Sequence, residues 1–283
     1  MNKILRKEVL APRITEFEVY APEIAAKAQP GHFVVLRVHE KGERIPLTIA
    51  DYDAVKGTIT MVSQEVGKTT CHLATLDVGD FLADVVGPLG TPMHIEKVGC
   101  VVCVSGGLGV APMYPKARRF YELGSRVISF IGAQTKEMII FKERMEKVSH
   151  HVGYSTDDGS FGHHGFVTDL LREFLESGEK VDEVVAIGPL PMMRAAVRVT
   201  RDFGVKTIVS LNPIMVDGTG MCGGCRVTVG GEVKFACVDG PAFDGHKVDF
   251  EELMARQNRF LEEERIAMER FRAQGEGCKC QER

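Results

Sequence analysis

Short stretches of alternating polar and apolar residues fill the first third of the chain. Between residue 3 and about residue 90 they include TEFEVYAP, HFVVLRV, PLTIAD, GTITMVS and FLADVVGPLG, with turn-forming residues between them. Alternation is the pattern of a strand with one buried face, and many short strands with frequent turns are typical of a closed antiparallel sheet. Residues 1–96 are therefore predicted to form a small antiparallel β barrel.

The pattern changes over residues 97–211, where apolar segments are followed by glycine-containing turns and then by helical periodicity. CVVCVS precedes GGLGVAP, RVISFIG precedes a charged helical stretch, and EVVAIG precedes PLPMMRAAVRV. Apolar strands that alternate with helices are typical of a parallel sheet built from βαβ units. This region is predicted to be a Rossmann-like α/β nucleotide domain.

The rest of the chain divides into a glycine- and cysteine-rich module and a helical end. Residues 212–248 contain two short strand candidates, CRVTVG and VKFACV, and residues 249–273 have the periodicity of a charged amphipathic helix. This helix and the tail make up a last segment, residues 249–283, and the tail, RAQGEGCKCQER, is expected to be disordered. The sequence leaves open whether its Cys278 and Cys280 have a role.

Composition and charge narrow the class of protein. The 283 residues are 44% hydrophobic and 26% charged with a net charge of −4, as in a soluble globular protein that does not bind nucleic acid. The N-terminus lacks the apolar core of a signal peptide, and no apolar run approaches the ~18 residues of a membrane span. We therefore expect a cytoplasmic protein with no membrane partner, whose eight cysteines are thiols or metal ligands rather than disulfides.

The segment EVGKTT in the barrel region could contact a phosphate group. Val62 stands where a P-loop requires glycine, so ATP binding is disfavoured. Thr69 and Thr70 follow the turn at Gly67 and begin a predicted helix, where they could either contact a phosphate or cap the helix.

The extended segment RIPLTIAD is a second candidate for cofactor contact. Arg44 and Thr48 could supply a guanidinium and a hydroxyl to a pyrophosphate, and the extended backbone could hydrogen-bond the edge of a flavin ring. A surface arginine beside a strand is the alternative interpretation.

Four special turns follow the strands of the nucleotide domain: SGGLGVAP, IGAQTKE, STDDGSFGHHG and IGPLPMM. In a doubly wound sheet such turns meet at the ligand crevice outside the carboxyl ends of the strands. Asp157 and Asp158 would repel a 2′-phosphate at the ribose, which favours NAD(H) over NADP(H). His163 and His164 are interpreted as solvated rather than metal-bound.

The cysteine-rich module contains the spacing Asp217-x4-Cys222-x2-Cys225-x11-Cys237. The plant-type [2Fe–2S] pattern is C-x4-C-x2-C followed by a distant cysteine, so here an aspartate occupies the first ligand position. A zinc site with three Cys and one Asp is one alternative. Another keeps Asp217 as a loop cap and takes the fourth ligand from elsewhere. The other cysteines are Cys71, Cys100, Cys103, Cys278 and Cys280.

In their order along residues 1–250, these motifs resemble the ferredoxin–NADP reductase superfamily. They are residues 44–48, 67–70, 106–112 and 188–193 and the cysteine loop. The resemblance is to the branch with a C-terminal [2Fe–2S] domain, which includes electron-transfer subunits of dihydroorotate dehydrogenase and small subunits of sulfide dehydrogenase. Within that branch, SLNPIMVDGTGMCGGCRV is similar to the small subunits of NADH-dependent reduced ferredoxin:NADP+ oxidoreductases. Dihydroorotate subunits have a cysteine where Asp217 stands.

This resemblance implies three cofactors: FAD, NAD(H) and a [2Fe–2S] cluster. FAD would lie between the barrel and the nucleotide domain, at Arg44, Pro46, Leu47, Thr48, Ser63, Gln64, Gly67, Thr69 and Thr70. NAD(H) would contact Gly106, Gly107, Gly109, Gln134, Asp157, Asp158, Gly188, Pro189 and Met192. The cluster ligands would be Asp217, Cys222, Cys225 and Cys237. Pro46 stands where the plant reductases have an aromatic residue.

The implied activity is electron exchange between NAD(H), flavin and cluster, and the sequence shows no acid–base pair for turnover of an organic substrate. The resemblance also implies a larger iron–sulfur flavoprotein partner that binds NADP(H), with ferredoxin as a further acceptor in an electron-bifurcating complex. An electron-transfer subunit of dihydroorotate or sulfide dehydrogenase is the alternative. A zinc-stabilised nucleotide-binding sensor is an alternative of another class.

Overall fold

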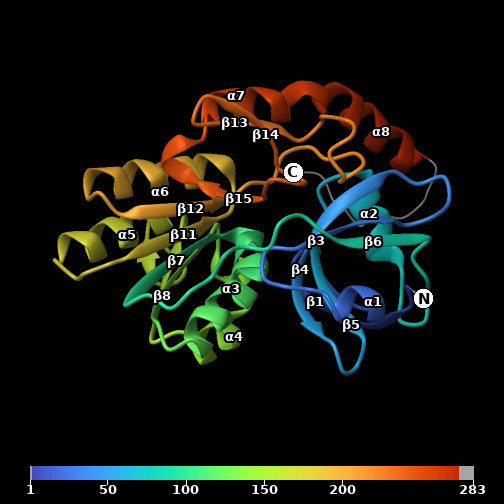
Figure 1. Cartoon of the computed structure of the whole chain (residues 1–283). Helices are drawn as coiled ribbons and strands as arrows, with labels where there is room; N and C mark the ends of the chain where they lie inside the picture. The colour runs from blue at the N-terminus through green and yellow to red at the C-terminus, as the bar shows by residue number, and fades with distance from the viewer. Residues whose placement is uncertain (1, 274–283) are drawn as a thin grey trace.

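The computed structural model describes residues 2–273, so the tail with Cys278 and Cys280 lies outside the described residues. The predicted fold class, an antiparallel barrel followed by an α/β domain and a small cysteine-rich module, is confirmed. Figure 1 shows the barrel and the nucleotide domain side by side, with the C-terminal helices running across both. None of the described helices is long and apolar enough to cross a membrane.

The barrel is a six-stranded antiparallel sheet with the order β1-β2-β5-β4-β3-β6. Its strands are β1 (Ile4–Ala11), β2 (Ile14–Tyr20), β3 (Phe33–Arg37), β4 (Arg44–Asp53), β5 (Thr58–Gln64) and β6 (Asp84–Leu89), with short helices α1 (Pro22–Ala25) and α2 (Lys68–Thr75). Backbone hydrogen bonds from Ile4 to Asp80 (2.9 Å) and from Leu82 to Asn2 (3.0 Å) close it near the N-terminus.

Strand β3 shows how alternation in the sequence builds this architecture. Val34 and Leu36 point into the barrel core, whereas Phe33 and Val35 join the core shared with the nucleotide domain and the cysteine module. Successive side chains of a strand point to opposite faces, so one apolar strand serves two cores.

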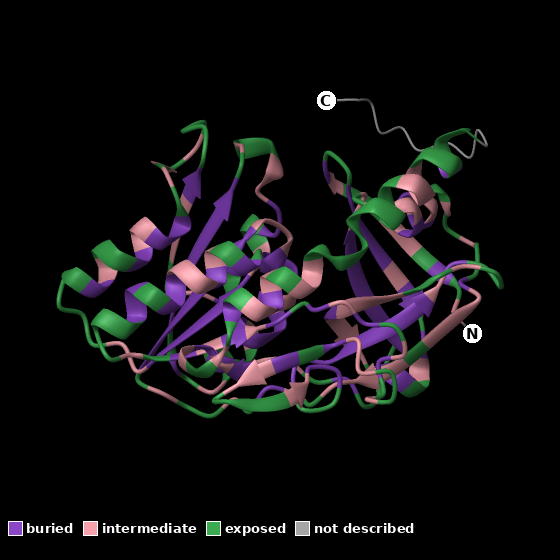
Figure 2. Cartoon of the chain, turned by 90° about the horizontal axis from the view of Figure 1, so that it is seen from above, coloured by how far each residue is buried: buried purple, intermediate pink, exposed green. Residues whose placement is uncertain are grey.

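The nucleotide domain is a seven-stranded sheet with the order β10-β9-β8-β7-β11-β12-β15. Its strands are β7 (Cys100–Gly106), β8 (Arg126–Ala133), β9 (His151–Thr156), β10 (His163–His164), β11 (Glu183–Ile187), β12 (Lys206–Ser210) and β15 (Ala242–Asp244). Its helices are α3 (Val110–Glu122), α4 (Lys142–Lys147), α5 (Val167–Glu176) and α6 (Leu190–Asp202), with 3-10 turns η1 (Gly107–Gly109) and η2 (Lys136–Met138). All pairings are parallel except β12 with β15. The order reverses at β7, where a doubly wound sheet has its ligand crevice. Figure 2 shows buried strands between helices whose outer faces are exposed.

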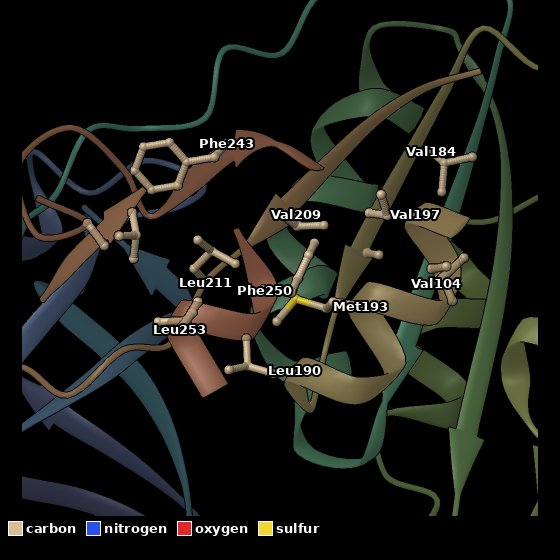
Figure 3. Close-up of a cluster of buried hydrophobic side chains, with 14 of the residues drawn as sticks. Val104, Val184, Leu190, Met193, Val197, Val209, Leu211, Phe243, Phe250 and Leu253 are labelled. Atoms are coloured by element: carbon tan, nitrogen blue, oxygen red, sulfur yellow. The ribbon is translucent and has the colours of Figure 1, made fainter. Parts of the chain in front are cut away.

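The cysteine-rich region does not form a fully separate unit. It contains the hairpin β13 (Arg226–Val229) and β14 (Glu232–Phe235) and the turn η3 (Gly245–Lys247), but its strand β15 completes the nucleotide sheet. Phe243 of β15 packs in one core with Leu211 and Met193 (Figure 3). This shared core fixes the module against the nucleotide domain.

The predicted single helix at 249–273 is two helices joined by a 3-10 turn: α7 (Phe250–Gln257), η4 (Asn258–Phe260) and α8 (Leu261–Ala273). Phe250 and Leu253 of α7 are buried in the core shown in Figure 3. Helix α8 packs on α2 of the barrel, where Phe271 is 1% exposed and its ring centroid lies 6.1 Å from that of His72. The C-terminal helices therefore connect the nucleotide side of the molecule to the barrel.

Candidate cofactor sites

A cavity of about 1110 Å³ lies between the barrel, the carboxyl ends of the nucleotide-domain strands and the segment that enters the cysteine module. It collects many residues predicted from the sequence. From the FAD set, Pro46, Leu47, Thr48, Gln64 and Thr70 line it. From the NAD(H) set, Gly106, Gly107, Gly109, Gln134, Asp157, Gly188, Pro189 and Met192 line it. Two sequence regions predicted to bind different cofactors thus face one continuous space.

The barrel wall of this cavity comes from β4 and from the start of α2. Thr48 pairs with Phe33 in the sheet, so the residue pairing holds the predicted flavin segment along the cavity. Thr70 caps α2, because its Oγ1 accepts hydrogen bonds from the backbone N–H groups of Val66 and Gly67, each at 3.1 Å. Thr70 therefore both caps the helix and lines the cavity, so the two interpretations of this residue are compatible.

Four residues of the predicted FAD set do not line the cavity. They are Arg44, Ser63, Gly67 and Thr69. Arg44 is exposed at the start of β4, and the Thr69 hydroxyl donates to Glu43 at 2.8 Å. Ser63 is buried, and its hydroxyl has no hydrogen-bond partner among the described residues.

The nucleotide wall depends on close backbone approach at Gly109, the residue before α3. A Cβ atom there would lie 2.2 Å from the carbonyl oxygen of Ile187. Only glycine allows η1 to rest on the end of β11 at this distance. The turn after β7 and the turn at Gly188 therefore sit together, as the sequence predicted for a nucleotide crevice.

The structure separates the two adjacent aspartates of the predicted NAD(H) set. Asp157 lines the cavity, whereas the Asp158 carboxylate accepts hydrogen bonds from the Ser160 hydroxyl (2.6 Å) and backbone N–H (3.0 Å). These hydrogen bonds lower the pKa of Asp158. Asp158 therefore stabilises its own turn, and Asp157 is the carboxylate available to the cavity.

Several residues that line the cavity were not predicted from the sequence as site residues. They include Phe33, Leu108, Phe166, Thr168, Ser210, Asn212 and Gln257. Asn212 and Gln257 lie 45 positions apart and are joined by a hydrogen bond of 2.8 Å from Gln257 Nε2 to the Asn212 carbonyl. No local pattern marks such residues, because only tertiary packing brings them to the cavity.

The cysteine loop places two of its thiols together. Cys225 and Cys237 are buried, with their sulfur atoms 3.1 Å apart, and Cys222 is exposed. Burial, together with the neighbouring Cys225 thiol, raises the pKa of Cys237 to about 12. Among the described residues no three His, Cys, Asp or Glu side chains converge as a preformed metal site.

Asp217 acts as a cap for this loop. Its carboxylate accepts hydrogen bonds from the backbone N–H groups of Thr219 (2.9 Å), Met221 (3.2 Å) and Cys222 (3.1 Å). The Thr219 hydrogen bond is the largest of the causes that lower the pKa of Asp217. Asp217 is thus an anion held next to Cys222.

The donor set nevertheless fits an iron–sulfur cluster. Three thiols and one carboxylate lie on or beside one glycine-rich loop, and all four are anions when they bind metal. Gly218 packs this loop against the barrel, since a Cβ there would lie 2.8 Å from Val35 and 2.9 Å from Leu89. The remaining described cysteines lie in other elements: Cys71 is buried in α2, and Cys100 and Cys103 are buried in β7.

Comparison with known proteins supports both sites. Residues 103–198 match the family model described as oxidoreductase NAD-binding domain. Residues 212–249 match the model described as iron-sulfur cluster binding domain of dihydroorotate dehydrogenase B. The predicted NAD(H) and iron–sulfur cofactors are therefore confirmed.

Similar proteins are found along nearly the whole chain. The dihydroorotate dehydrogenase B (NAD(+)) electron transfer subunit homolog of Thermotoga maritima is 47% identical over 271 residues, covering 96% of this chain and 95% of that protein. The corresponding electron transfer subunit of Bacillus cereus (strain Q1) is 31% identical, covering 85% and 94%. A solved structure of the NADH-dependent reduced ferredoxin-NADP oxidoreductase, reported for flavin-based electron bifurcation, is 47% identical with a TM-score of 0.91, covering 96% and 98%.

More distant solved structures share the fold over most of the chain. The cytochrome b5 reductase domain of Ulva prolifera nitrate reductase is 19% identical with a TM-score of 0.59, covering 72% of this chain and 92% of that one. Fold and sites together define an NAD(H)-dependent iron–sulfur oxidoreductase subunit with a ferredoxin reductase-like architecture. The chain belongs to the family of dihydroorotate dehydrogenase B electron-transfer subunits and their homologues.

Proposed function

We propose that this chain carries FAD and a [2Fe–2S] cluster and exchanges electrons with NAD(H) inside a flavin-based electron-bifurcating oxidoreductase. The observation that carries this proposal is the position of Phe33. Phe33 lines the cavity, and a Cβ at Gly218 of the cysteine loop would lie 3.6 Å from its ring. One side chain thus separates the predicted flavin space from the predicted cluster loop.

In this proposal the residues of the chain bind and orient FAD and NAD(H), and none of them acts as an acid or base on a substrate. In this proposal residues 46–48, Gln64 and Thr70 bind FAD, and the turns at Gly106 and Gly188 bind NAD(H) on the other side of the cavity. Arg44, Ser63, Gly67 and Thr69 remain members of the proposed FAD contact set outside the cavity lining. Asp158, from the predicted NAD(H) set, is instead assigned to its own turn, where it accepts hydrogen bonds from Ser160. When bound, a flavin accepts a hydride as two electrons and can release them singly, as a one-electron iron–sulfur centre requires. The lining is mostly apolar, which would favour exclusion of water once the cofactors are bound.

For the cluster we propose Asp217, Cys222, Cys225 and Cys237 as ligands. Spacing and shared loop position support this set, while the cap formed by Asp217 supports the alternative of another fourth ligand. Exchange of Asp217 for Ala should then abolish the cluster, and exchange for Cys should retain it at a lower reduction potential, since a thiolate donates more electron density than a carboxylate. Iron content and an EPR-monitored titration test both. Full iron content in Asp217→Ala would show that Asp217 is only a cap.

We propose a larger iron–sulfur flavoprotein as partner, with an NADP(H) site and with ferredoxin as a second acceptor. The solved structure that is 47% identical is described as an NADH-dependent reduced ferredoxin-NADP oxidoreductase. The resemblance found in the sequence implies a cysteine at this position in dihydroorotate subunits, so Asp217 favours this partner over a dihydroorotate partner. The test is to purify the native complex and measure NADPH-dependent reduction of NAD+ with ferredoxin present. Dihydroorotate or sulfide oxidation by that complex would favour the alternative.

A cytoplasmic location is part of the proposal. The thiol ligands that the proposed cluster needs are typical of a reducing compartment. The zinc-stabilised sensor without redox activity loses support, because the cysteine module matches an iron–sulfur model and the chain belongs to an oxidoreductase family.

A further inference from the structure

Helix α7 contacts the cysteine loop although it follows the matched iron–sulfur region, residues 212–249. The Nη2 atom of Arg256 donates a hydrogen bond of 3.2 Å to the carbonyl oxygen of Gly224. Gly224 lies between Cys222 and Cys225, and its N–H donates to the Cys222 sulfur at 3.4 Å. The guanidinium of Arg256 is therefore bonded to the residue directly before Cys225 and two positions after Cys222.

The same helix also reaches the cavity. Gln257 lines it and donates to the Asn212 carbonyl at 2.8 Å. Asn212 begins the segment that leads from the cavity into the cysteine loop. Arg256 and Gln257 thus hold the two ends of this segment, so α7 fixes the position of the loop relative to the cavity.

Positive charge is concentrated at this contact. Burial, followed by the charges of the neighbouring Arg259 and Arg226, lowers the pKa of Arg256, while Glu252 and Cys225 act in the opposite direction. Arg226 and Arg259 are exposed, and Arg256 is half-buried. None of these three arginines forms an ion pair with a carboxylate of residues 2–273. Arg256 is the one of the three that is bonded to the loop, and Glu252 is the carboxylate whose charge opposes its own.

We propose that Arg256 is a positioning residue that raises the reduction potential of the cluster in this loop. It holds the turn between Cys222 and Cys225 and keeps a positive charge on the loop that would hold the cluster. Net charge and hydrogen bonding around a cluster are main determinants of its potential, and a nearby cation stabilises the more negative, reduced form. This inference rests on the proposed cluster.

The test is an EPR-monitored potentiometric titration of the full-length protein purified with its cofactors. Arg256→Gln should shift the potential to a lower value, and Arg256→Lys should lie between this variant and the wild type because it keeps the charge. Arg259→Gln removes a neighbouring charge but not the hydrogen bond to Gly224, so a smaller shift in the same direction is expected. Arg265→Gln, on α8 and paired with Glu262 and Glu269, is the charge-matched control and should not shift the potential.

An unchanged potential in Arg256→Gln with full iron content would overturn the inference. If this variant does not retain its iron, Arg259→Gln decides, and an unchanged potential there would overturn the electrostatic role. Absence of iron and of an EPR signal in the wild-type protein would instead refute the proposed function. The two failures are therefore distinguishable.

Discussion

Arg144 of α4 and Glu16 of β2 face each other across the boundary between the nucleotide domain and the barrel. Their side chains share two hydrogen bonds, Nη1 to Oε2 at 2.6 Å and Nη2 to Oε1 at 2.9 Å. The Glu16 side chain is fully buried, and Arg6 is its second partner. This ion pair joins segments 128 residues apart and helps to set the orientation of the two domains that form the cavity.

Replacement of Glu16 by Gln should therefore destabilise the protein, because two guanidinium groups lose their shared anion. Removing one partner of a buried, hydrogen-bonded ion pair at an interface costs about 2–5 kcal/mol. Chemical denaturation measures this loss. Glu8→Gln is the matched control: Glu8 contacts Arg6 but is exposed, so a change of about 0–1 kcal/mol is expected. Equal effects of the two substitutions would contradict the structural role of Glu16.

The same pair predicts a pH dependence of stability. Burial alone would raise the pKa of Glu16, but hydrogen bonds and charge from Arg144 and Arg6 outweigh it and lower the pKa below its ordinary value. Its stabilising contribution is therefore fully present above the unfolded-state pKa of about 4.3 and is lost as pH falls through the lower folded-state pKa. Below about pH 4 the wild type should lose stability more steeply than Glu16→Gln. Parallel curves in acid denaturation would contradict this assignment.

Asp157 should discriminate between the two nicotinamide cofactors. It is the aspartate that lines the cavity, so replacing it by Ser removes a negative charge that would face a 2′-phosphate. The NADPH-to-NADH ratio of flavin reduction efficiency should rise by at least about tenfold, equivalent to about 1.4 kcal/mol. Asp158→Asn is the control and should leave the ratio near that of the wild type, since this carboxylate is bonded to Ser160. A larger change of this ratio in Asp158→Asn than in Asp157→Ser would contradict the assignment of Asp157 to the ribose.

Gly109 should not tolerate even a methyl group. In Gly109→Ala the new carbon would lie 2.2 Å from the carbonyl oxygen of Ile187, so η1 must move away from β11. We expect NADH affinity to fall by more than about tenfold while FAD content is retained, because the barrel wall is unchanged. Equilibrium binding and the flavin absorbance measure the two effects. Unaltered NADH affinity would argue against this turn as the nucleotide site.

Phe271 should anchor α8 to the barrel. It is 1% exposed, and truncation of a buried phenylalanine costs about 3–5 kcal/mol. In Phe271→Ala we expect α8 to detach, so that hydrogen exchange within residues 261–273 becomes faster. Phe260→Ala, at a position that is 48% exposed, is the control and should leave exchange unchanged. Slow exchange in the Phe271 variant would show that other contacts hold the helix.

The parts of the site that follow local rules could be predicted from the sequence. The strand, turn and helix pattern around residues 106–112 places Gly109 at the crevice, because parallel strands bring their carboxyl ends to one edge. The cysteine spacing likewise marks the cluster loop, which matches an iron–sulfur family model. In both cases, residues close in sequence determine the chemistry.

Other parts could not be predicted because they depend on distant packing. The pairing of Glu16 with Arg144 and the reach of Gln257 into the cavity involve segments far apart in the chain. Strand β15 lies within the residue range predicted for the cysteine module, but it pairs with β12 and completes the nucleotide sheet. The roles of Asp157 and Asp158 differ because Asp157 lines the cavity, whereas Asp158 accepts two hydrogen bonds from Ser160.

An anaerobic titration of the purified protein with NADH tests the central claim most directly. A two-electron flavin and a one-electron [2Fe–2S] cluster that exchange electrons should together accept about three electrons, or about 1.5 equivalents of NADH. The flavin absorbance should bleach, and an EPR signal from reduced iron should appear in the same titration. An end point at about one equivalent without an iron signal would contradict the account, because flavin alone would then be the acceptor.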